Sequence, residues 1–159
     1  MGKFLLENDA LNGSQGSAFM TINGQNIEMF NIKKMQVDGE FQESDFKVVG
    51  TTLVQKKTTG ISYTGSMTIY YGTPYFIRLL NDYAKTGKLP YFTLQITNDD
   101  PNTSVGTQTV VLYNVKLQKM PIAMLDTDAD WLEEEIGFSF TNFEVLNYFN
   151  DAPTQLGGN

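Results

Sequence analysis

The sequence predicts a mainly β protein with one α-helix, and two observations support this fold class. Apolar and polar residues alternate along several short segments, which is the period of a half-buried strand. A single segment instead places apolar residues at helical spacing directly after a proline. The chain has 159 residues, and 41% of them are hydrophobic. A chain of this length can bury a full core, so we expect one domain over residues 1–159.

The clearest predicted strand covers residues 61–71. Alternate positions from Ile61 to Tyr71 are mostly apolar and share one face of the strand. The positions between them form a row of hydroxyl side chains on the other face: Ser62, Thr64, Ser66 and Thr68. In an antiparallel sheet with one solvated face such a row is ordinary exposed surface, but it could instead line a wide, uncharged channel.

Further strands are predicted by the same alternation at 18–22, 92–97, 109–118 and 136–140. The sequence Asn23-Gly24 predicts a tight hairpin turn after the first of them. The apolar register slips near Lys33-Lys34 and again at Asn142, which indicates a bulge or a bend at each place.

One helix is predicted at about residues 74–86. Thr73 is a suitable cap, Pro74 suits the first helical position, and Gly87 offers a left-handed stop. Between them, apolar residues at helical spacing predict a face that packs on the sheet: Phe76, Leu79, Leu80 and Tyr83.

Three segments do not fit a compact core. Residues 38–60 are polar at both ends and too long for an ordinary connection, so we expect a lid, or an extended arm or loop that becomes ordered against another molecule. The N-terminal segment 1–16 and the C-terminal tail 151–159 are expected to be flexible.

The composition excludes most enzyme chemistry. The chain has no His and no Cys, so it has no Ser-His-Asp or Cys-His nucleophile and no His/Cys metal site. No glycine-rich nucleotide cradle is present either. Eighteen acidic residues make some carboxylate pair inevitable, so a carboxylate-based hydrolase has little support. We therefore expect a protein that is not an enzyme and has no cofactor.

Charge is unevenly distributed. The first 119 residues hold 11 bases and 10 acids (11 − 10 = +1), whereas the last forty hold 8 acids and no base (−8). With one Arg and a net charge of −7, the chain is not expected to bind nucleic acid in a sequence-specific way. The apolar runs are too short for a membrane span. The asymmetry is either a solvated acidic face or a sign that acidic and basic surfaces of identical subunits meet.

The acidic segment Asp126–Asp130 resembles the start of a calcium loop. Asp126, Asp128 and Asp130 stand at alternate positions, but Trp131 replaces the turn glycine and Gly137 the final Glu. These three Asp residues are weak metal candidates. A capped turn entering a short helical segment at 131–135 fits the pattern better.

Several motifs in a common order resemble the XkdM-type phage tail tube proteins. They lie at 57–60, 65–71, 95–101, 106–112 and 125–135 and read KTTG, GSMTIYY, QITNDDP, GTQTVVL and LDTDADWLEEE. The resemblance runs from about Leu11 to Tyr148 and is carried by the order and spacing of the pieces. That family forms the inner tubes of contractile phage tails, of PBSX-like defective prophage particles and of phage-tail-like bacteriocins.

The resemblance implies a small antiparallel β-sandwich or open barrel with one helix, a fold shared with the tube protein of type VI secretion. It implies hexameric rings of identical subunits that stack into a channel, which DNA would cross in a phage. The partners it implies are further copies, the tail sheath protein, the tape-measure protein and baseplate proteins. It also implies a location in the bacterial host cytoplasm during assembly and in a virion or tail-like particle afterwards.

Stacking of this kind needs two different complementary surfaces, and charged residues near the 38–60 arm and in the acidic segment are the candidates. The residues expected at ring or stacking interfaces are Lys33, Lys34, Glu40, Glu43, Asp45, Lys47, Lys56, Lys57, Asp126, Asp128 and Asp130. The hydroxyl row 62–68 is the candidate for the lumen, which should lack Lys and Arg if phosphate is to slide past. The alternative function is a β-sandwich ligand-binding module, which could be calcium-dependent.

Overall fold

The computed structural model describes residues 4–5, 11, 13, 15–29, 32–150 and 155–156. The fold is mainly β with one helix, as the sequence predicts, and all strand pairs are antiparallel. In chain order the elements are β1 (Phe4–Leu5), β2 (Gly16–Ile22), β3 (Gln25–Glu28), β4 (Ile32–Phe46), β5 (Gln55–Tyr70), α1 (Tyr75–Thr86), β6 (Phe92–Asp99), β7 (Thr107–Lys119), β8 (Glu133–Phe140), β9 (Asn142–Asn147) and β10 (Gln155–Leu156).

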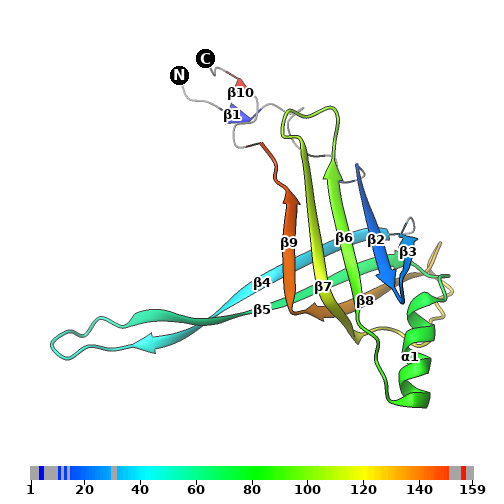
Figure 1. The fold of residues 1–159 in the computed structure, drawn as a ribbon, viewed down its shortest axis with the longest axis horizontal. Coiled ribbons are helices and arrows are strands. Elements are labelled where there is room, and N and C mark those ends of the chain that lie inside the picture. Colours follow the sequence, from blue (N-terminus) through cyan, green and yellow to red (C-terminus); the bar gives the residue numbers. More distant parts are fainter. Residues whose placement is uncertain are drawn as a thin grey trace. The chain divides into compact units, whose positions relative to one another are not determined.

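Hydrogen-bonded pairing links eight strands in the order β3-β2-β6-β7-β8-β5-β4, with β9 also paired to β7 (Figure 1). Among the described residues the two end strands, β3 and β4, do not pair with each other, so the sheet is not closed into a barrel. The short strands β1 and β10 pair separately. The flexibility predicted for 1–16 and 151–159 falls largely outside the described residues. No described helix has the length and apolar character needed to cross a membrane.

The chain divides into two compact units. The first comprises residues 1–31, 90–115 and 142–159, and its sheet is made of β2, β3, β6, β9 and most of β7. Met20, Leu94 and Leu112 lie opposite one another on three adjacent strands and are fully buried. Asn23 and Gly24 both have positive φ, 51° and 77°, which confirms the predicted tight turn between β2 and β3.

The second unit comprises residues 32–89 and 116–141 and contains β4, β5, β8, α1 and the end of β7. Its core face carries Met67 opposite Ile136, and Gly65 opposite Phe138. Met67, Ile136 and Phe138 are buried, and the ring of Phe138 lies over Gly65, where a Cβ would come within 2.5 Å of it. The alternation predicted for 61–71 is therefore confirmed from Gly65 to Ile69, where the strand is covered.

The helix of this unit is α1, which buries Phe76 and Leu79 as predicted, whereas Leu80 is half-buried and Tyr83 is exposed, contrary to the predicted packing face. It ends at Gly87, whose φ of 73° is left-handed and whose N–H donates to the Tyr83 carbonyl at 2.8 Å. The predicted cap at Thr73 is wrong: the capping position is Pro74, and no side chain caps the helix. A proline here needs no capping partner of its own because it has no N–H.

The extended arm expected at residues 38–60 is present as a regular hairpin, because β4 continues to Phe46 and β5 begins at Gln55, which leaves only residues 47–54 as a loop. The helical segment expected at 131–135 is wrong, since β8 begins at Glu133 and pairs with β5 from that residue onward. Long-range pairing with Tyr70 and Ile69 overrides the local turn signal.

The two predicted irregularities are present. The β4–β5 register shifts between Ile32 and Lys34, and a second shift lies between Gln42 and Glu43. At the other place, β8 ends at Phe140, Thr141 forms a bend, and Asn142 starts β9 on β7. The slip in apolar register thus marks a change of strand rather than a bulge within one strand.

Candidate functional site

The most prominent feature of the second unit is a hairpin arm, residues 38–62, formed by the outer halves of β4 and β5 and their loop. Every residue from 38 to 62 is exposed, whereas the inner halves of the same strands pass into the core. In Figure 1 the arm continues far beyond β8. The paired backbone gives the arm its own hydrogen bonds, so it holds an extended shape without covering contacts from the described chain.

The arm carries more apolar surface than a solvated hairpin needs. Phe41 lies opposite Ile61 in the register, and both are on the face that becomes the core face further along β5. The loop adds further exposed apolar side chains, and Val49 is fully exposed. The set is Phe41, Phe46, Val48, Val49, Leu53, Val54 and Ile61. Exposed apolar side chains gathered on one hairpin are typical of an interaction site.

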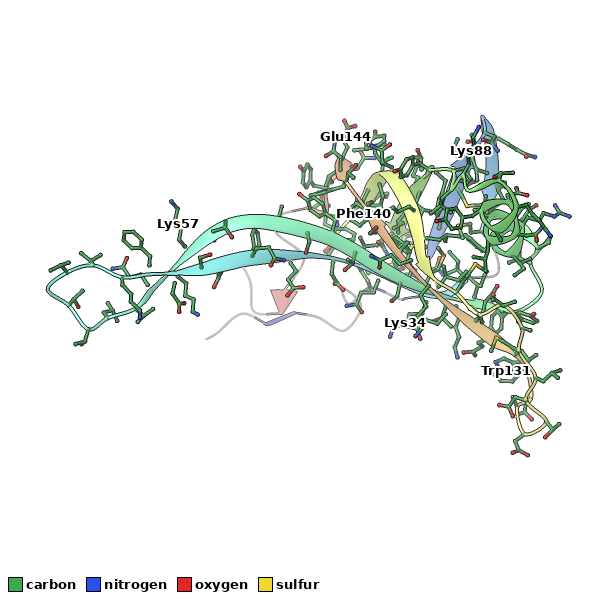
Figure 2. All side chains as sticks on the ribbon, turned by 90° about the horizontal axis from the view of Figure 1, so that it is seen from below. Lys34, Lys57, Lys88, Trp131, Phe140 and Glu144 are labelled. Carbon is green, nitrogen blue, oxygen red and sulfur yellow. The ribbon has the colours of Figure 1, made fainter. Side chains whose placement is uncertain are left out.

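The arm also holds most of the charged residues predicted at interfaces. The ammonium of Lys56 lies 2.9 Å from a carboxylate oxygen of Asp45, its neighbour across the hairpin. Both groups are exposed, so the pair contributes little to stability and is screened by salt. Lys47 and Lys57 are exposed and, within the described chain, have no ion pair; Figure 2 shows Lys57 on the arm.

The hydroxyl row of β5 forms part of a wider polar face. On β4 the partners of this row are Lys34, Gln36, Asp38 and Glu40, and on β8 they are Glu135, Gly137 and Ser139. Directly opposed residues in an antiparallel pair point to the same side, so these side chains share one face. Gln42 donates to the Ser62 hydroxyl at 3.2 Å, and Gln36 donates to Asp38 at the same distance.

This polar face is not free of lysine, contrary to the requirement stated for a lumen. Lys34 lies opposite Thr68, Lys116 opposite Ser139, and Lys119 opposite Gly137. Three carboxylates, those of Asp38, Glu40 and Glu135, offset them on the same face. The face therefore has no net formal charge, which limits attraction to phosphate without removing every basic group.

Lys33 forms an ion pair with Glu133, whereas Lys34 lies opposite Thr68 on the polar face. Its ammonium lies 2.6 Å from Glu133 Oε1, which also accepts a hydrogen bond from the Trp131 indole at 2.8 Å. The hydrogen bond to Glu133 raises the pKa of Lys33, and the bonds from Lys33 and Trp131 lower the pKa of Glu133. Lys33 is thus committed to a contact within its own chain, 100 residues away in sequence.

The acidic segment 126–130 forms an exposed loop. The Asp128 N–H donates to Asp126 Oδ1 at 3.0 Å, which is the pattern of a local Asx turn. Asp126, Asp128 and Asp130 do not come together: within the described ranges, no three acidic side chains form a group that could hold a metal ion. The segment provides negative charge at the surface without a built calcium site.

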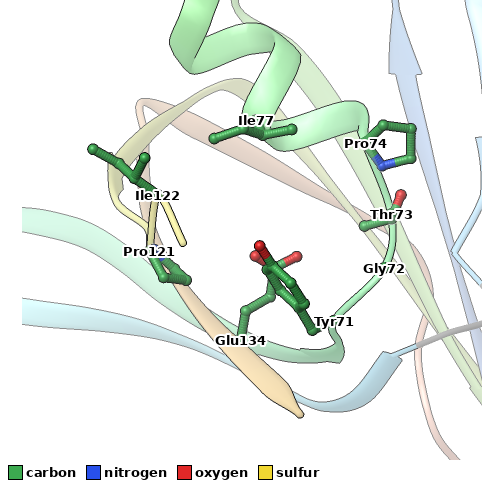
Figure 3. A pocket seen from close by; sticks show the side chains of 8 residues that line it. All are labelled: Tyr71, Gly72, Thr73, Pro74, Ile77, Pro121, Ile122 and Glu134. Atoms are coloured by element: carbon green, nitrogen blue, oxygen red, sulfur yellow. The ribbon is translucent and has the colours of Figure 1, made fainter. Parts of the chain in front are cut away.

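Sequence reasoning missed a small pocket beside β8. It encloses about 250 Å³ and is lined by Tyr71, Gly72, Thr73, Pro74, Ile77, Pro121, Ile122 and Glu134 (Figure 3). Glu134 is only 3% exposed, and its burial raises the pKa of its carboxyl group. A signal was available: Glu134 has the same strand parity as Ile136, Phe138 and Phe140, so a carboxyl occupies a core position.

Comparison with known proteins identifies the class of this molecule. The phage tail tube protein family matches residues 3–147. The PBSX phage-like element protein XkdM of Bacillus subtilis (strain 168) is 38% identical over 144 residues, which covers 91% of this chain and 95% of that protein. The chain belongs to the phage tail tube protein family. Its family and structural neighbours are structural proteins rather than enzymes.

Solved structures show the same fold at low sequence identity. A chain of the anti-feeding prophage tube-terminating cap matches with a TM-score of 0.64 and 8% identity, covering 86% of this chain and 90% of that one. A chain of the sheath–tube complex of an extracellular contractile injection system matches with a TM-score of 0.57 and 12% identity, covering 80% and 86%. The SPP1 tail tube gives a TM-score of 0.59 and 10% identity, covering 86% and 78%.

Proposed function

We propose that this protein is the inner-tube subunit of a contractile phage tail or phage-tail-like particle, and that it assembles into stacked hexameric rings around a channel. The observation that carries the proposal is the hairpin arm: a fully exposed β-ribbon with seven exposed apolar side chains, on a member of the tail tube family. Its apolar face has no covering partner in the described chain, so a second copy is the expected partner.

The arm and the open edges of the sheet give assembly its physical basis. β3 and β4 each present one unpaired edge among the described strands, and exposed edges invite pairing with another chain. Ring closure by edge pairing would remove these edges. An arm that reaches a neighbouring ring would bury its apolar residues at the same time. Sheath, tape-measure and baseplate proteins would then bind the assembled tube, in the host cytoplasm during assembly.

The direct test is a concentration series imaged by negative-stain electron microscopy. We expect rings and tubes to appear as concentration rises, and a featureless monomer at every concentration would refute the proposal. A matched variant replaces residues 43–59 with Asn-Gly, which joins Gln42 to its register partner Gly60 through a tight turn. Because the removed residues are exposed, its thermal stability should be unchanged while tube formation is lost.

The polar face of β4, β5 and β8 is proposed as the channel lining. The chain has no Cys, so Thr64→Cys gives a single reactive thiol on that face. In the unassembled protein a small and a bulky maleimide should both react with it. In tubes the small reagent should still react, whereas a reagent wider than the channel should not. Equal reaction of assembled tubes with the bulky reagent would place this face on the outside.

If the same face lines the channel, added positive charge on it should slow the passage of DNA. Ser62→Lys, Thr64→Lys or Ser66→Lys would add a base to a face whose formal charges now balance, and bases hold phosphate. Such variants in a phage should assemble normally and eject DNA more slowly. Unaltered infectivity would count against the channel assignment.

A further inference from the structure

The Glu134 pocket is large enough to hold a side chain from another molecule, and it contains the carboxyl group of Glu134, which has no partner within the described chain. At about 250 Å³ it is smaller than the roughly 300–1,000 Å³ of pockets that hold drug-sized ligands, so it suits one or two side chains. Figure 3 shows the Glu134 carboxyl reaching toward the centre of the lining, beside Tyr71 and below Ile77 of α1. The seven other lining residues carry no charged side chain.

Glu134 has no hydrogen-bond or ion-pair partner among the described side chains, although it is almost fully buried. Buried polar groups are nearly always hydrogen-bonded, and an unpaired buried carboxylate is costly. The preceding residue on β8 behaves differently, since Glu133 is paired with Lys33. A buried carboxyl without such a pair within the described chain is suited to a partner that arrives from another molecule.

The surroundings of the pocket specify the chemistry of that partner. Ile122 on its lining is 73% exposed, and Leu125 and Trp131 of the adjoining segment are also exposed. The same segment carries Asp126, Asp128 and Asp130. A partner must therefore present a cation flanked by apolar side chains.

The tip of the hairpin arm has this chemistry. Lys47 is the one charged residue of the loop 47–54, and Val48 and Val49 follow it directly. The other two arm lysines fit less well. Lys56 is already paired with Asp45, and Lys57 is flanked by Lys56 and Thr58.

We propose that the Glu134 pocket receives the arm tip of a second copy, with the Lys47 ammonium against the Glu134 carboxylate. The tip and the pocket lie at opposite ends of β5, a strand of 16 residues, or about 50 Å at about 3.3 Å per residue. The chain's own tip cannot reach its own pocket. In such a head-to-tail contact each copy still has one free tip or one free pocket, so the contact continues from copy to copy into a filament. The inference therefore rests on the proposed function, assembly into a tube.

Disulfide trapping tests the contact directly, because the wild-type chain has no Cys. The variant Val48→Cys with Ile122→Cys keeps the Lys47 ammonium and, oxidised after assembly, should give a ladder of linked oligomers on a non-reducing gel. The matched control is Val48→Cys with Lys85→Cys, which keeps the tip thiol and moves its exposed partner to the last turn of α1. The control should give no ladder, and an equal ladder in both variants would overturn the proposal.

A charge test addresses the pair itself. Lys47→Met and Glu134→Gln should each raise the concentration needed for tube formation by about tenfold or more, and the double variant should cost no more than either alone. Glu134→Gln should also make the unassembled protein more stable at neutral pH, because it removes an uncompensated buried charge. If Glu134 had only a packing role, its substitution would not raise the stability of the unassembled protein while weakening assembly.

The outcomes separate this inference from the proposed function. Normal wild-type tubes, with no ladder from the 48–122 pair and normal assembly of both charge variants, would overturn the pocket contact and leave the tube function standing. Absence of tubes from the wild-type protein would overturn both. A ladder together with impaired assembly of both charge variants supports the contact.

Discussion

The packing of Phe138 over Gly65 makes a sharp prediction about the second unit. In Gly65→Ala, the new Cβ would lie 2.5 and 2.6 Å from two ring carbons of Phe138 and 3.1 Å from the Gln36 carbonyl oxygen. Carbon atoms in good contact are about 3.5–4.0 Å apart, so the ring would have to retreat by about 1 Å. The ring is fully buried, so its movement would disturb the neighbouring core side chains.

The expected cost follows from these distances. Overpacking a core costs about 1–3 kcal/mol. Replacing glycine with alanine lowers the conformational entropy of the unfolded chain, which stabilises the folded state by about 0.4–1 kcal/mol. We therefore expect Gly65→Ala to lower the free energy of unfolding by about 1–2 kcal/mol. For a chain of this size that corresponds to a fall in Tm of about 2–8 °C.

The assay is thermal or urea unfolding of the unassembled protein, with Gly60→Ala as the matched control. Gly60 lies on the same strand, and no atom comes within 4 Å of the position that its Cβ would take. Its variant should match or slightly exceed the wild type. A double variant of Gly65→Ala with Phe138→Leu should lose less than the sum of the two single losses, because the smaller side chain relieves the clash. Equal stability of Gly65→Ala and Gly60→Ala would refute the packing argument.

Three further predictions follow from the same unit. Glu134→Gln should stabilise the unassembled protein at neutral pH, because burial raises the pKa of Glu134 and so disfavours its charged form; the gain should vanish as pH falls below about 4.3, where the carboxyl is protonated in both states. In the Lys33–Glu133 pair, the raised pKa of Lys33 adds folding stability at pH values below the ordinary pKa of lysine, and the lowered pKa of Glu133 adds it at pH values above the ordinary pKa of glutamate. Lys33→Ala should therefore change Tm only slightly, with the difference confined to pH values of about 4–10 and abolished by salt. Gly87→Ala should cost about 1 kcal/mol in urea unfolding because its φ of 73° is left-handed, and a loss no larger than that of Gly60→Ala would contradict this reading of the helix end.

Local patterns predicted the elements whose causes are local. The Asn23-Gly24 turn needs only two residues that tolerate positive φ, and the end of α1 needs only Gly87. The strand pattern at 61–71 identified the two faces of β5 correctly. The predicted helical segment at 131–135 failed because a local signal competed with long-range strand pairing, and the predicted cap at Thr73 missed the observed capping position, Pro74, by one residue.

The candidate site was only partly predictable. Residues 38–60 were recognised as unusual from their polarity, but the hairpin depends on the pairing of residues up to 37 positions apart. Two residues predicted at interfaces between subunits, Lys33 and Lys56, form ion pairs within the chain itself. Glu134 was overlooked among three consecutive acids because its inward direction is a matter of strand parity.

The sequence by itself determined the class of fold, the exclusion of His and Cys chemistry, the resemblance to tail tube proteins and the split of charge along the chain. Alternation specifies which side chains share a face, because the side-chain period of a strand is two. It does not specify which strand lies alongside or what covers the face. Tertiary structure alone decided that the apolar face of β5 is covered near Met67 and left bare at Ile61, and that Glu134 is buried in a pocket. These outcomes depend on register between distant segments, which no local pattern encodes.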